Sequence, residues 1–349
     1  MIAAALLPLL LAGAAHGEAR PPSRGPYFVA ASSTAARVCW RSGPAREGDA
    51  CRRIEGLAPG ATFSYTIDDS TAAWTAKALP ADGADLRFAV FGDIGSGDPA
   101  QHSVAAVLER WEPELVLITG DVVYPKGKDQ SYDAKYFLPY GGLLTRTPFF
   151  PALGNHDYGN TSEREKGEKR FRKHYRPIHH RPRYYSFDAG GAHFISLDDN
   201  REGYGVKAAA SLAPGSEQRQ WLERDLAAAQ ARWKIVFLHV PLYTSRPHGN
   251  HGRLRDELEP LLVQHGVDVV FSGHNHHYER HQPIKEITHI TAGMGGAGLY
   301  EVAEQGPQSV KFLKDFGFVG ITLTRDQLTL EMIDRHGRVR DRHVIEKKH

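Results

Sequence analysis

Five short polar segments of this chain combine Asp, Asn, His and Tyr, which are residue types that bind metal ions. Each segment follows an apolar run, and in chain order they are GDIG (92–95), GDVVY (120–124), GNHD (154–157), VFLH (236–239) and GHNH (273–276). Carboxylate, amide, phenol and imidazole groups are all plausible ligands, and together they exceed what one ion requires. A carboxylate that bridges two ions is typical of two-metal sites for phosphoryl transfer. The segments therefore predict a binuclear metal centre, with Asp121 as the candidate bridge.

Each segment also has an ordinary explanation when it is taken alone. Gly-Asp before a turn is often a helix cap, and a lone His239 is more often a packed core histidine than a ligand. The complete set favours a metal site, because five such segments follow five apolar runs in order. Histidine is also concentrated in this part of the chain, since eight of the 19 histidines lie between residues 239 and 281. Such clustering is one way in which a metal site appears in a sequence.

The segments require elements that bring them together, and the pattern after residue 86 supplies such elements. Apolar runs at 86–91, 114–118, 233–238 and 267–272 read as strands. Amphipathic segments at 103–111, 217–230 and 253–266 read as helices, and 317–345 reads as a β-meander. Strands that alternate with helices predict an α/β domain over 86–349. In such sheets, ligands gather at the carboxyl ends of the strands, where all five segments stand.

The preceding part of the chain, residues 26–80, has a different pattern. Short alternating runs separated by Gly and Pro predict a small β-sandwich. Cys39 and Cys51 are the two cysteines of the sequence and fall in a stretch that reads as a hairpin. An even cysteine count in an exported chain favours a disulfide, whereas the alternative is two free buried thiols. We expect the disulfide.

The N-terminus reads as a targeting segment rather than as part of the fold. Residues 2–15 are apolar but too short to span a membrane as a helix. Ala15-His16-Gly17 has the small-x-small form of a signal-peptidase site. A buried N-terminal helix is the alternative. We expect residues 1–17 to be a signal peptide and the mature protein to be exported, either secreted or periplasmic.

Composition excludes several classes of protein. The 349 residues are 41% hydrophobic and 24% charged, which excludes a disordered, collagen-like or coiled-coil chain. The net charge of +2 gives no electrostatic footprint for nucleic acid. After the N-terminal segment, no stretch of the sequence reaches 18 apolar residues, so no membrane span is expected.

With these motifs, the chain resembles the calcineurin-like metallophosphoesterases and, within them, the purple acid phosphatases. The likeness of the five motifs runs from Gly92 to Arg280, and the flanking parts fit the layout of two-domain members. It implies a four-layered αββα sandwich preceded by a small fibronectin type III-like β-domain. It also implies two ions joined by Asp121: Fe(III) held by Asp93, Tyr124 and His276, and a divalent Zn, Mn or Fe held by Asn155, His239 and His274.

One position separates this chain from the wider superfamily. In most members, the first of the five motifs is Asp-x-His, and the resemblance implies that this His binds the first metal. Gly95 stands there instead, so a ligand is missing, and Tyr124 is placed to supply it. A phenolate is a hard anionic oxygen that favours a trivalent ion over Zn or Mn. The alternative reading of Tyr124 is a packed aromatic at the end of a strand.

The resemblance also implies histidines that point at the phosphate and the leaving group. His156 follows Asn155 directly, and His248 lies nine residues after His239. Both would stabilise charge or donate a proton. His251 is an alternative partner for His248 in the donor role. Asp157 either orients His156 or caps a helix.

The expected function is hydrolysis of phosphate monoesters by a metal-bound hydroxide, at acid pH, on a small phosphate-ester substrate. Fe(III) acidifies its bound water strongly, which allows the reaction below neutral pH. Phosphodiester cleavage at the same site is the first alternative. A non-catalytic protein that binds metal or anions at a surface is a second, and redox chemistry at iron is a third. The complete set of implied ligands favours the enzyme.

Overall fold

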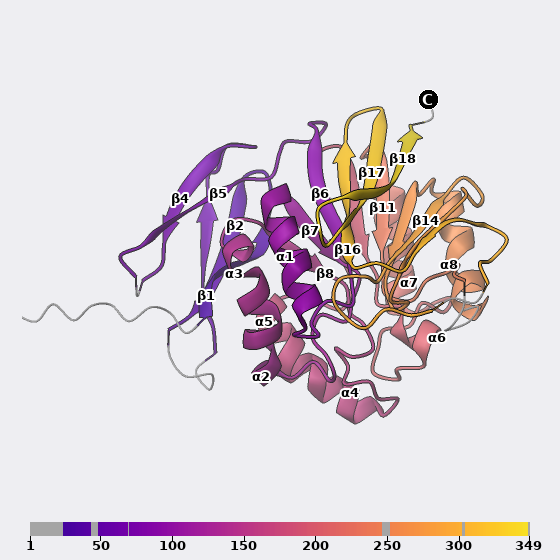
Figure 1. Ribbon diagram of the computed structural model, residues 1–349, viewed down its shortest axis with the longest axis horizontal. Helices are drawn as coiled ribbons and strands as arrows, with labels where there is room; N and C mark the ends of the chain where they lie inside the picture. The colour runs from indigo at the N-terminus through magenta and orange to yellow at the C-terminus, as the bar shows by residue number, and fades with distance from the viewer. Residues whose placement is uncertain (1–23, 43–47, 69, 246–251, 302–303, 348–349) are drawn as a thin grey trace, which may run out of the picture.

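The computed structural model describes residues 24–42, 48–68, 70–245, 252–301 and 304–347 (Figure 1). The expected signal peptide at 1–17 and the candidate acids His248 and His251 lie outside these residues. No helix among the described ranges is long and apolar enough to cross a membrane.

Two large sheets form the centre of the molecule (Figure 1). In spatial order, the first sheet consists of β15 (Ser309–Leu313), β13 (Tyr278–His281), β14 (Thr288–Ala292), β12 (Val269–Ser272), β11 (Trp233–Phe237), β10 (Ala192–Ser196) and β9 (Tyr185–Ala189). The second consists of β18 (Val339–Glu346), β17 (Gln327–Asp334), β16 (Gly317–Leu323), β6 (Leu86–Phe91), β7 (Leu115–Ile118) and β8 (Phe149–Pro151). Neighbouring strands in β6-β7-β8 and in β10-β11-β12-β14 run parallel.

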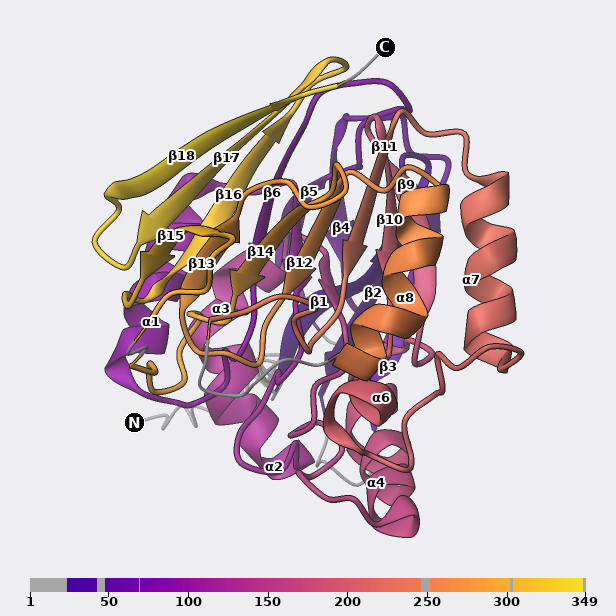
Figure 2. The same cartoon turned by 90° about the vertical axis from the view of Figure 1, so that its right-hand side faces the viewer.

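Helices and short helical turns lie outside the sheets or in their connections. They are α1 (Pro99–Trp111), α2 (Asp129–Tyr132), η2 (Asp133–Phe137), α3 (Leu138–Leu144), α4 (Arg164–Arg170), η3 (Phe171–Tyr175), α5 (Arg176–His179), α6 (Asn200–Tyr204), α7 (Glu217–Ala228) and α8 (Gly252–Gln264). Figure 2 shows α7 and α8 beside the strands of the first sheet. Helices α1 and α3 cover the second sheet from the opposite side.

The apolar runs explain why the sheets are sandwiched. In β6, Phe88 faces a core shared by the two sheets, while Phe91 faces the core under α1. A strand whose two faces are both covered needs apolar residues in succession rather than in alternation. On the other outer face, Leu222 of α7 and Leu258 of α8 pack over Val236 of β11. The four-layered αββα arrangement expected from the resemblance is therefore confirmed.

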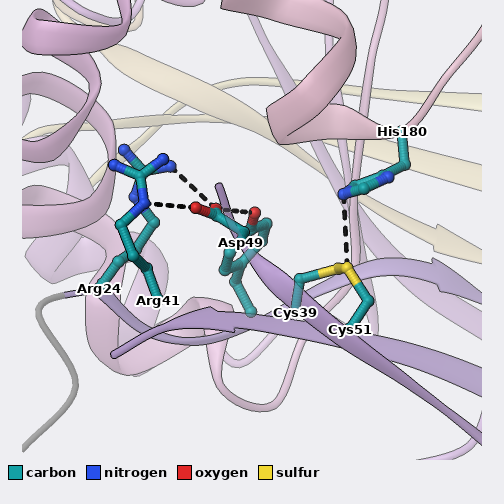
Figure 3. Close-up of a disulfide and its surroundings, with 7 residues drawn as sticks. Arg24, Cys39, Arg41, Asp49, Cys51 and His180 are labelled. Atoms are coloured by element: carbon teal, nitrogen blue, oxygen red, sulfur yellow. Dashed lines mark hydrogen bonds and ion pairs between the residues drawn. A yellow bond between two sulfur atoms is a disulfide. The ribbon is translucent and has the colours of Figure 1, made fainter. Parts of the chain in front are cut away.

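A strand-rich N-terminal part precedes β6, as expected. Its strands are β1 (Arg24–Ala31), β2 (Ala35–Arg41) and β3 (Ala50–Glu55) in one sheet, and β4 (Thr62–Thr66) and β5 (Ala73–Lys77) in a hairpin. Phe28, Trp40 and Tyr65 are buried in their common core. Cys39 of β2 lies directly opposite Cys51 of β3, and the two form a disulfide (Figure 3). The expected pairing is confirmed.

Candidate metal centre

The loops after five strands converge on one site. Their strands are β6, β7, β8, β11 and β12, and the candidate residues follow the ends of these strands by two to six positions. Backbone hydrogen bonds hold the loops together: Asp93 N donates to Gly120 O at 3.0 Å, and Gly273 N donates to His239 O at 2.9 Å. The carboxyl ends of the parallel strands thus bring the five motifs into contact, as the sequence pattern predicts.

One half of the site centres on the phenol of Tyr124. Its hydroxyl lies 2.8 Å from Asp93 Oδ1, 2.9 Å from Asp121 Oδ2 and 3.1 Å from His276 Nε2. His276 Nε2 is also 3.3 Å from Asp93 Oδ1. Two carboxylates, a phenol and an imidazole therefore share one small volume, a donor set that suits a hard, highly charged cation.

The other half centres on His239. Its Nε2 lies 3.0 Å from Asn155 Oδ1 and 3.5 Å from Asp121 Oδ2, and its ring centroid is 5.0 Å from that of His274. Apart from Asp121, these ligands carry no charge when they bind a metal, and they suit a divalent ion. Ligand atoms of Asp93, Asp121 and His239 all lie within 4.8 Å of one another. Asp121 belongs to both halves, so its carboxylate is in the position of a bridge.

Burial makes the charges of this site strongly dependent on one another. Burial raises the pKa of Asp93, but the hydrogen bond and charge of His276 and the charge of His239 lower it overall. Burial lowers the pKa of His239, yet the charges of Asp121 and Asp93 raise it to about 9. Burial and the same two carboxylates raise the pKa of Tyr124 well above its usual value. A buried group of carboxylates is stable only beside positive charge, which cations bound here would provide.

The backbone at the site is held in an uncommon conformation. Asp93, Asp121 and His274 have φ values of 57°, 52° and 67°, in the left-handed region that non-glycine residues seldom adopt. Such conformations persist where the surrounding structure imposes them, and they concentrate at functional sites. Three of the candidate ligands are thus fixed by the turns that follow their strands.

Backbone carbonyls orient the candidate imidazole ligands. His239 Nδ1 contacts Thr119 O at 2.8 Å, and His276 Nδ1 contacts Gly298 O at 2.7 Å. Each contact fixes the ring so that Nε2 points into the site, which is the usual support of a metal-binding histidine.

Two supporting residues were not identified from the sequence. Asp199 accepts hydrogen bonds from His239 N at 3.1 Å and Val240 N at 2.7 Å, and it holds this loop. Asn160 Oδ1 accepts from Asn155 Nδ2 at 3.2 Å, which turns Asn155 Oδ1 toward His239. Asp199 follows β10, whose His193 and Ser196 interrupt the apolar pattern, and Asn160 lies in a turn with a positive φ of 51°, so neither was marked from the sequence.

Two tyrosines at the site were also missed. The ring of Tyr300 stacks on His276 at 4.2 Å between centroids, and Tyr204 meets His274 edge to face at 5.2 Å. Tyr204 is 44% exposed, so its contact with His274 lies at the solvent side of the site.

His156 lies at the site, but its support differs from the expectation. His156 Nδ1 contacts Pro125 O at 2.6 Å, and Nε2 lies 3.9 Å from Asp121 Oδ2. The Asp157 carboxylate instead accepts from Gly154 N at 2.8 Å and Val122 N at 3.2 Å. The interpretation that Asp157 orients His156 is therefore wrong, because Pro125 takes that role and Asp157 ties two loops together.

Comparisons with known proteins agree with this architecture. Residues 86–278, more than half of the chain, match the model of the calcineurin-like phosphoesterase family. Purple acid phosphatase 21 of Arabidopsis thaliana is 28% identical over 269 residues, which cover 70% of this chain and 57% of that protein. Purple acid phosphatase 4 of the same plant is 26% identical over 293 residues, which cover 75% and 84%. This chain thus spans little more than half the length of some curated relatives.

Solved structures share the fold. A purple acid phosphatase from yellow lupin seeds (Lupinus luteus) superposes with a TM-score of 0.74 at 20% identity, and the match covers 92% of this chain and 74% of the lupin chain. PhoD superposes with a TM-score of 0.70 at 14% identity, and the match covers 94% and 91%.

Proposed function

Because the chain belongs to the calcineurin-like phosphoesterase family, whose members cleave phosphoesters with the help of metal ions, we propose that it is an acid phosphatase acting on phosphate monoesters. The observation that carries the proposal is the shared position of Asp121. Its Oδ2 lies 2.9 Å from the Tyr124 hydroxyl and 3.5 Å from His239 Nε2, so one carboxylate serves two ligand groups.

The donor chemistry supports two different ions. Asp93, Tyr124 and His276 offer two acidic oxygens and one nitrogen, which fit Fe(III). Asn155, His239 and His274 offer neutral donors, which fit Zn, Mn or Fe in the divalent state. When bound, such a pair of cations neutralises phosphate oxygens and acidifies a coordinated water, which is the attacking group in this class of reaction.

The residues of the chain position the substrate around that pair. His156 is fixed through Nδ1 by Pro125, so Nε2 remains on the side of Asp121, where it stabilises phosphate charge or donates a proton to the leaving group. We infer that His248, or His251, shares this role. Tyr204 borders the solvent side of the site and limits access for the leaving group.

The function is tested by metal analysis combined with rates on two substrates. We expect about two ions per chain in this centre, at least one of them iron, and faster hydrolysis of phenyl phosphate than of a bis-aryl phosphodiester, with the optimum below pH 7. A preparation fully active with zinc alone would exclude the Fe(III) assignment. A higher rate on the diester would move the activity to the phosphodiesterase alternative.

Asp121→Ala tests the bridge. Loss of the shared carboxylate should release both ions and lower hydrolysis by roughly 10³-fold or more. Asp326→Ala is the matched control, because this carboxylate is 62% exposed and lies on the surface. Retention of both ions and of turnover by Asp121→Ala would mean that the ligand set is wrong.

We further infer three parts of the chain: an export signal at 1–17, a small fibronectin type III-like domain at 26–80 and the catalytic domain at 86–349. The apolar run at 2–15 and the change of pattern near residue 82 support this division. N-terminal sequencing of the protein recovered from outside the cytoplasm should begin at Glu18. A mature protein that begins at Met1 would exclude cleavage.

A further inference from the structure

A second histidine cluster lies on β13 and β14 and takes no part in the proposed reaction. Successive side chains of a strand point to opposite faces, so Glu279 and His281 share one face of β13, and His277, which directly precedes the strand, lies within 3.4 Å of Glu279. His289 of β14 stands next to His281, because Arg280 pairs with Ile290 in the antiparallel register. All four side chains are buried, with exposures of 0%, 0%, 3% and 3% in chain order.

The ring nitrogens of this cluster are short of partners. Within the described part of the chain, both nitrogens of His277, both of His281 and Nε2 of His289 make no hydrogen bond of normal geometry. The backbone carbonyls of Tyr243 and Gln308 approach the His281 ring without completing such a bond. Their approach to Glu279 is close but incomplete, since its Oε2 lies 3.4 Å from His277 Nε2 and 3.7 Å from His281 Nε2. Buried polar groups are nearly always satisfied in folded proteins, so this concentration of unsatisfied nitrogens points to a missing ligand.

The carboxylate at the centre is held in place from its other side. Ser245 N donates to Glu279 Oε2 at 2.8 Å, and Ser245 Oγ donates to Oε1 at 2.5 Å. Hydrogen bonds of this kind orient carboxylates that bind metals.

His281 and His289 stand beside each other on neighbouring strands, because their positions lie opposite each other in the antiparallel register of β13 and β14. Both also pack against the ring of Tyr243, at centroid distances of 6.3 Å and 4.9 Å, which places them on one side of the cluster.

We propose that His277, Glu279 and His281 form a third metal site for a single Zn²⁺ ion, with His289 as its fourth ligand. Three imidazoles and one carboxylate are a donor set that zinc prefers, and four protein ligands are typical of a structural site. The cluster is more open than Asp93, Asp121 and His239, whose ligand atoms lie within 4.8 Å of one another. We expect the rings to move inward when the ion binds, to the usual Zn–N distance of about 2 Å. The site shares no ligand with the catalytic centre.

The stoichiometry of zinc binding tests this site. The full chain is stripped with a chelator, dialysed against Zn²⁺ and analysed for metal. We expect three ions per chain in the wild type and two in His281→Gln, and hydrolysis by the iron-containing enzyme should persist in that variant. His179→Gln is the matched control, because His179 is equally buried but lies in α5 beside Tyr132. It should bind three ions. Equal stoichiometry in the wild type and His281→Gln would overturn the proposal.

A second measurement keeps the test valid if His281→Gln does not fold. Asp121→Ala lacks the bridge of the catalytic centre but keeps the strand cluster, so it should still bind one Zn²⁺ ion. Zinc should raise its Tm by ~3 °C, because an ion that binds only the folded state stabilises it. An Asp121→Ala protein that binds no zinc overturns the third site. This count is independent of the proposed reaction, since it does not depend on whether the wild type hydrolyses monoesters.

Discussion

At the scale of single residues, the close packing that requires glycine at position 95 also positions Tyr124. A Cβ atom at Gly95 would lie 2.1 Å from Val122 O and 2.7 Å from Val123 Cα. These are backbone atoms that cannot rotate away, so the histidine found here in the wider superfamily does not fit this loop. The same close approach lets Tyr124 N donate to Gly95 O at 3.0 Å. The close approach that excludes a side chain at position 95 thus helps to position Tyr124, the proposed replacement ligand.

Replacement of Tyr124 by Phe tests this substitution of ligands. The variant keeps the ring but loses the hydroxyl that contacts Asp93, Asp121 and His276. We expect the iron-containing wild type to show a visible phenolate-to-Fe(III) band and Tyr124→Phe to lose it, with activity reduced about 10- to 100-fold. Absorption spectra at matched iron content check this. An unchanged band in Tyr124→Phe would show that Tyr124 is not an iron ligand.

A methyl group at Gly95 should be enough to disturb the site. Gly95→Ala forces the loop away from Val122 and should cost about 1–3 kcal/mol of stability. It should also weaken metal binding, because Tyr124 moves with the loop. Gly298→Ala is the matched control: Gly298 lies at the same site, and its Cβ would meet nothing within 4 Å. Urea unfolding of both variants measures the difference. Equal stability of the two would show that the loop has room for a side chain.

At the scale of elements, the sequence predicted those whose burial follows a simple pattern. The four apolar strands and three amphipathic helices from residue 86 onward are present, because both faces of the strands and one face of each helix are buried. Strand β13 was missed because Glu279 and His281 are buried polar residues, which hide the period that identifies a strand. Candidate ligands were predictable because they end apolar runs, whereas Asp199 and Asn160 act only through tertiary contacts.

The hairpin of β9 and β10 is joined to α7 through one histidine. His193 Nδ1 lies 2.7 Å from Asp188 Oδ1, and Nε2 lies 2.9 Å from Asp225 Oδ2. Asp225 also accepts from Ser186 Oγ at 2.7 Å. Burial lowers the pKa of His193, but the hydrogen bonds and charges of Asp225 and Asp188 raise it overall. The His193 ring therefore links β9, β10 and α7, and its two carboxylate partners favour the protonated form.

This link predicts a defined dependence of stability on pH. A pKa that is higher in the folded state adds stability that is complete below the unfolded value of about 6.5. The contribution disappears as the pH rises through the folded pKa. His193→Gln should therefore destabilise the protein by about 1 kcal/mol at pH 5.5 and by less at pH 9. The effect at pH 5.5 is modest because solvent screens the half-exposed Asp188. Urea unfolding at both values measures this. A loss that is larger at pH 9 would contradict the assignment.

At the scale of the whole molecule, one buried arginine connects the N-terminal strands to the second sheet's helices. Arg24 of β1 donates to Asp49 Oδ2 at 2.9 Å and to Asp133 Oδ1 in η2 at 2.8 Å. Its guanidinium also lies 4.1 Å from the ring centroid of Phe137. Arg41 binds the other oxygen of Asp49 (Figure 3). Tyr27 of β1 packs into the core under α1, so polar and apolar contacts both hold the two parts together.

Removal of Arg24 should therefore weaken the whole molecule rather than the N-terminal strands alone. The Arg24 side chain is fully buried and that of Asp49 is 3% exposed. Arg24→Met therefore leaves a buried carboxylate with Arg41 as its remaining cation and the Tyr27 hydroxyl as a neutral donor. Removal of one partner from a buried ion pair costs about 3–5 kcal/mol of stability. Asp133, the second partner of Arg24, is 54% exposed and becomes solvated when Arg24 is removed, so we expect a loss of about 2–3 kcal/mol. Arg53→Met is the matched control, because that arginine is 70% exposed in its pair with Glu55 and should cost less than about 1 kcal/mol.

If the strands are an integral part of the fold, Arg24→Met will unfold in one transition at lower urea, while the folded fraction keeps its metal content and its rate. Two separate transitions would instead show that the N-terminal strands unfold independently of the sandwich that holds the metal centre.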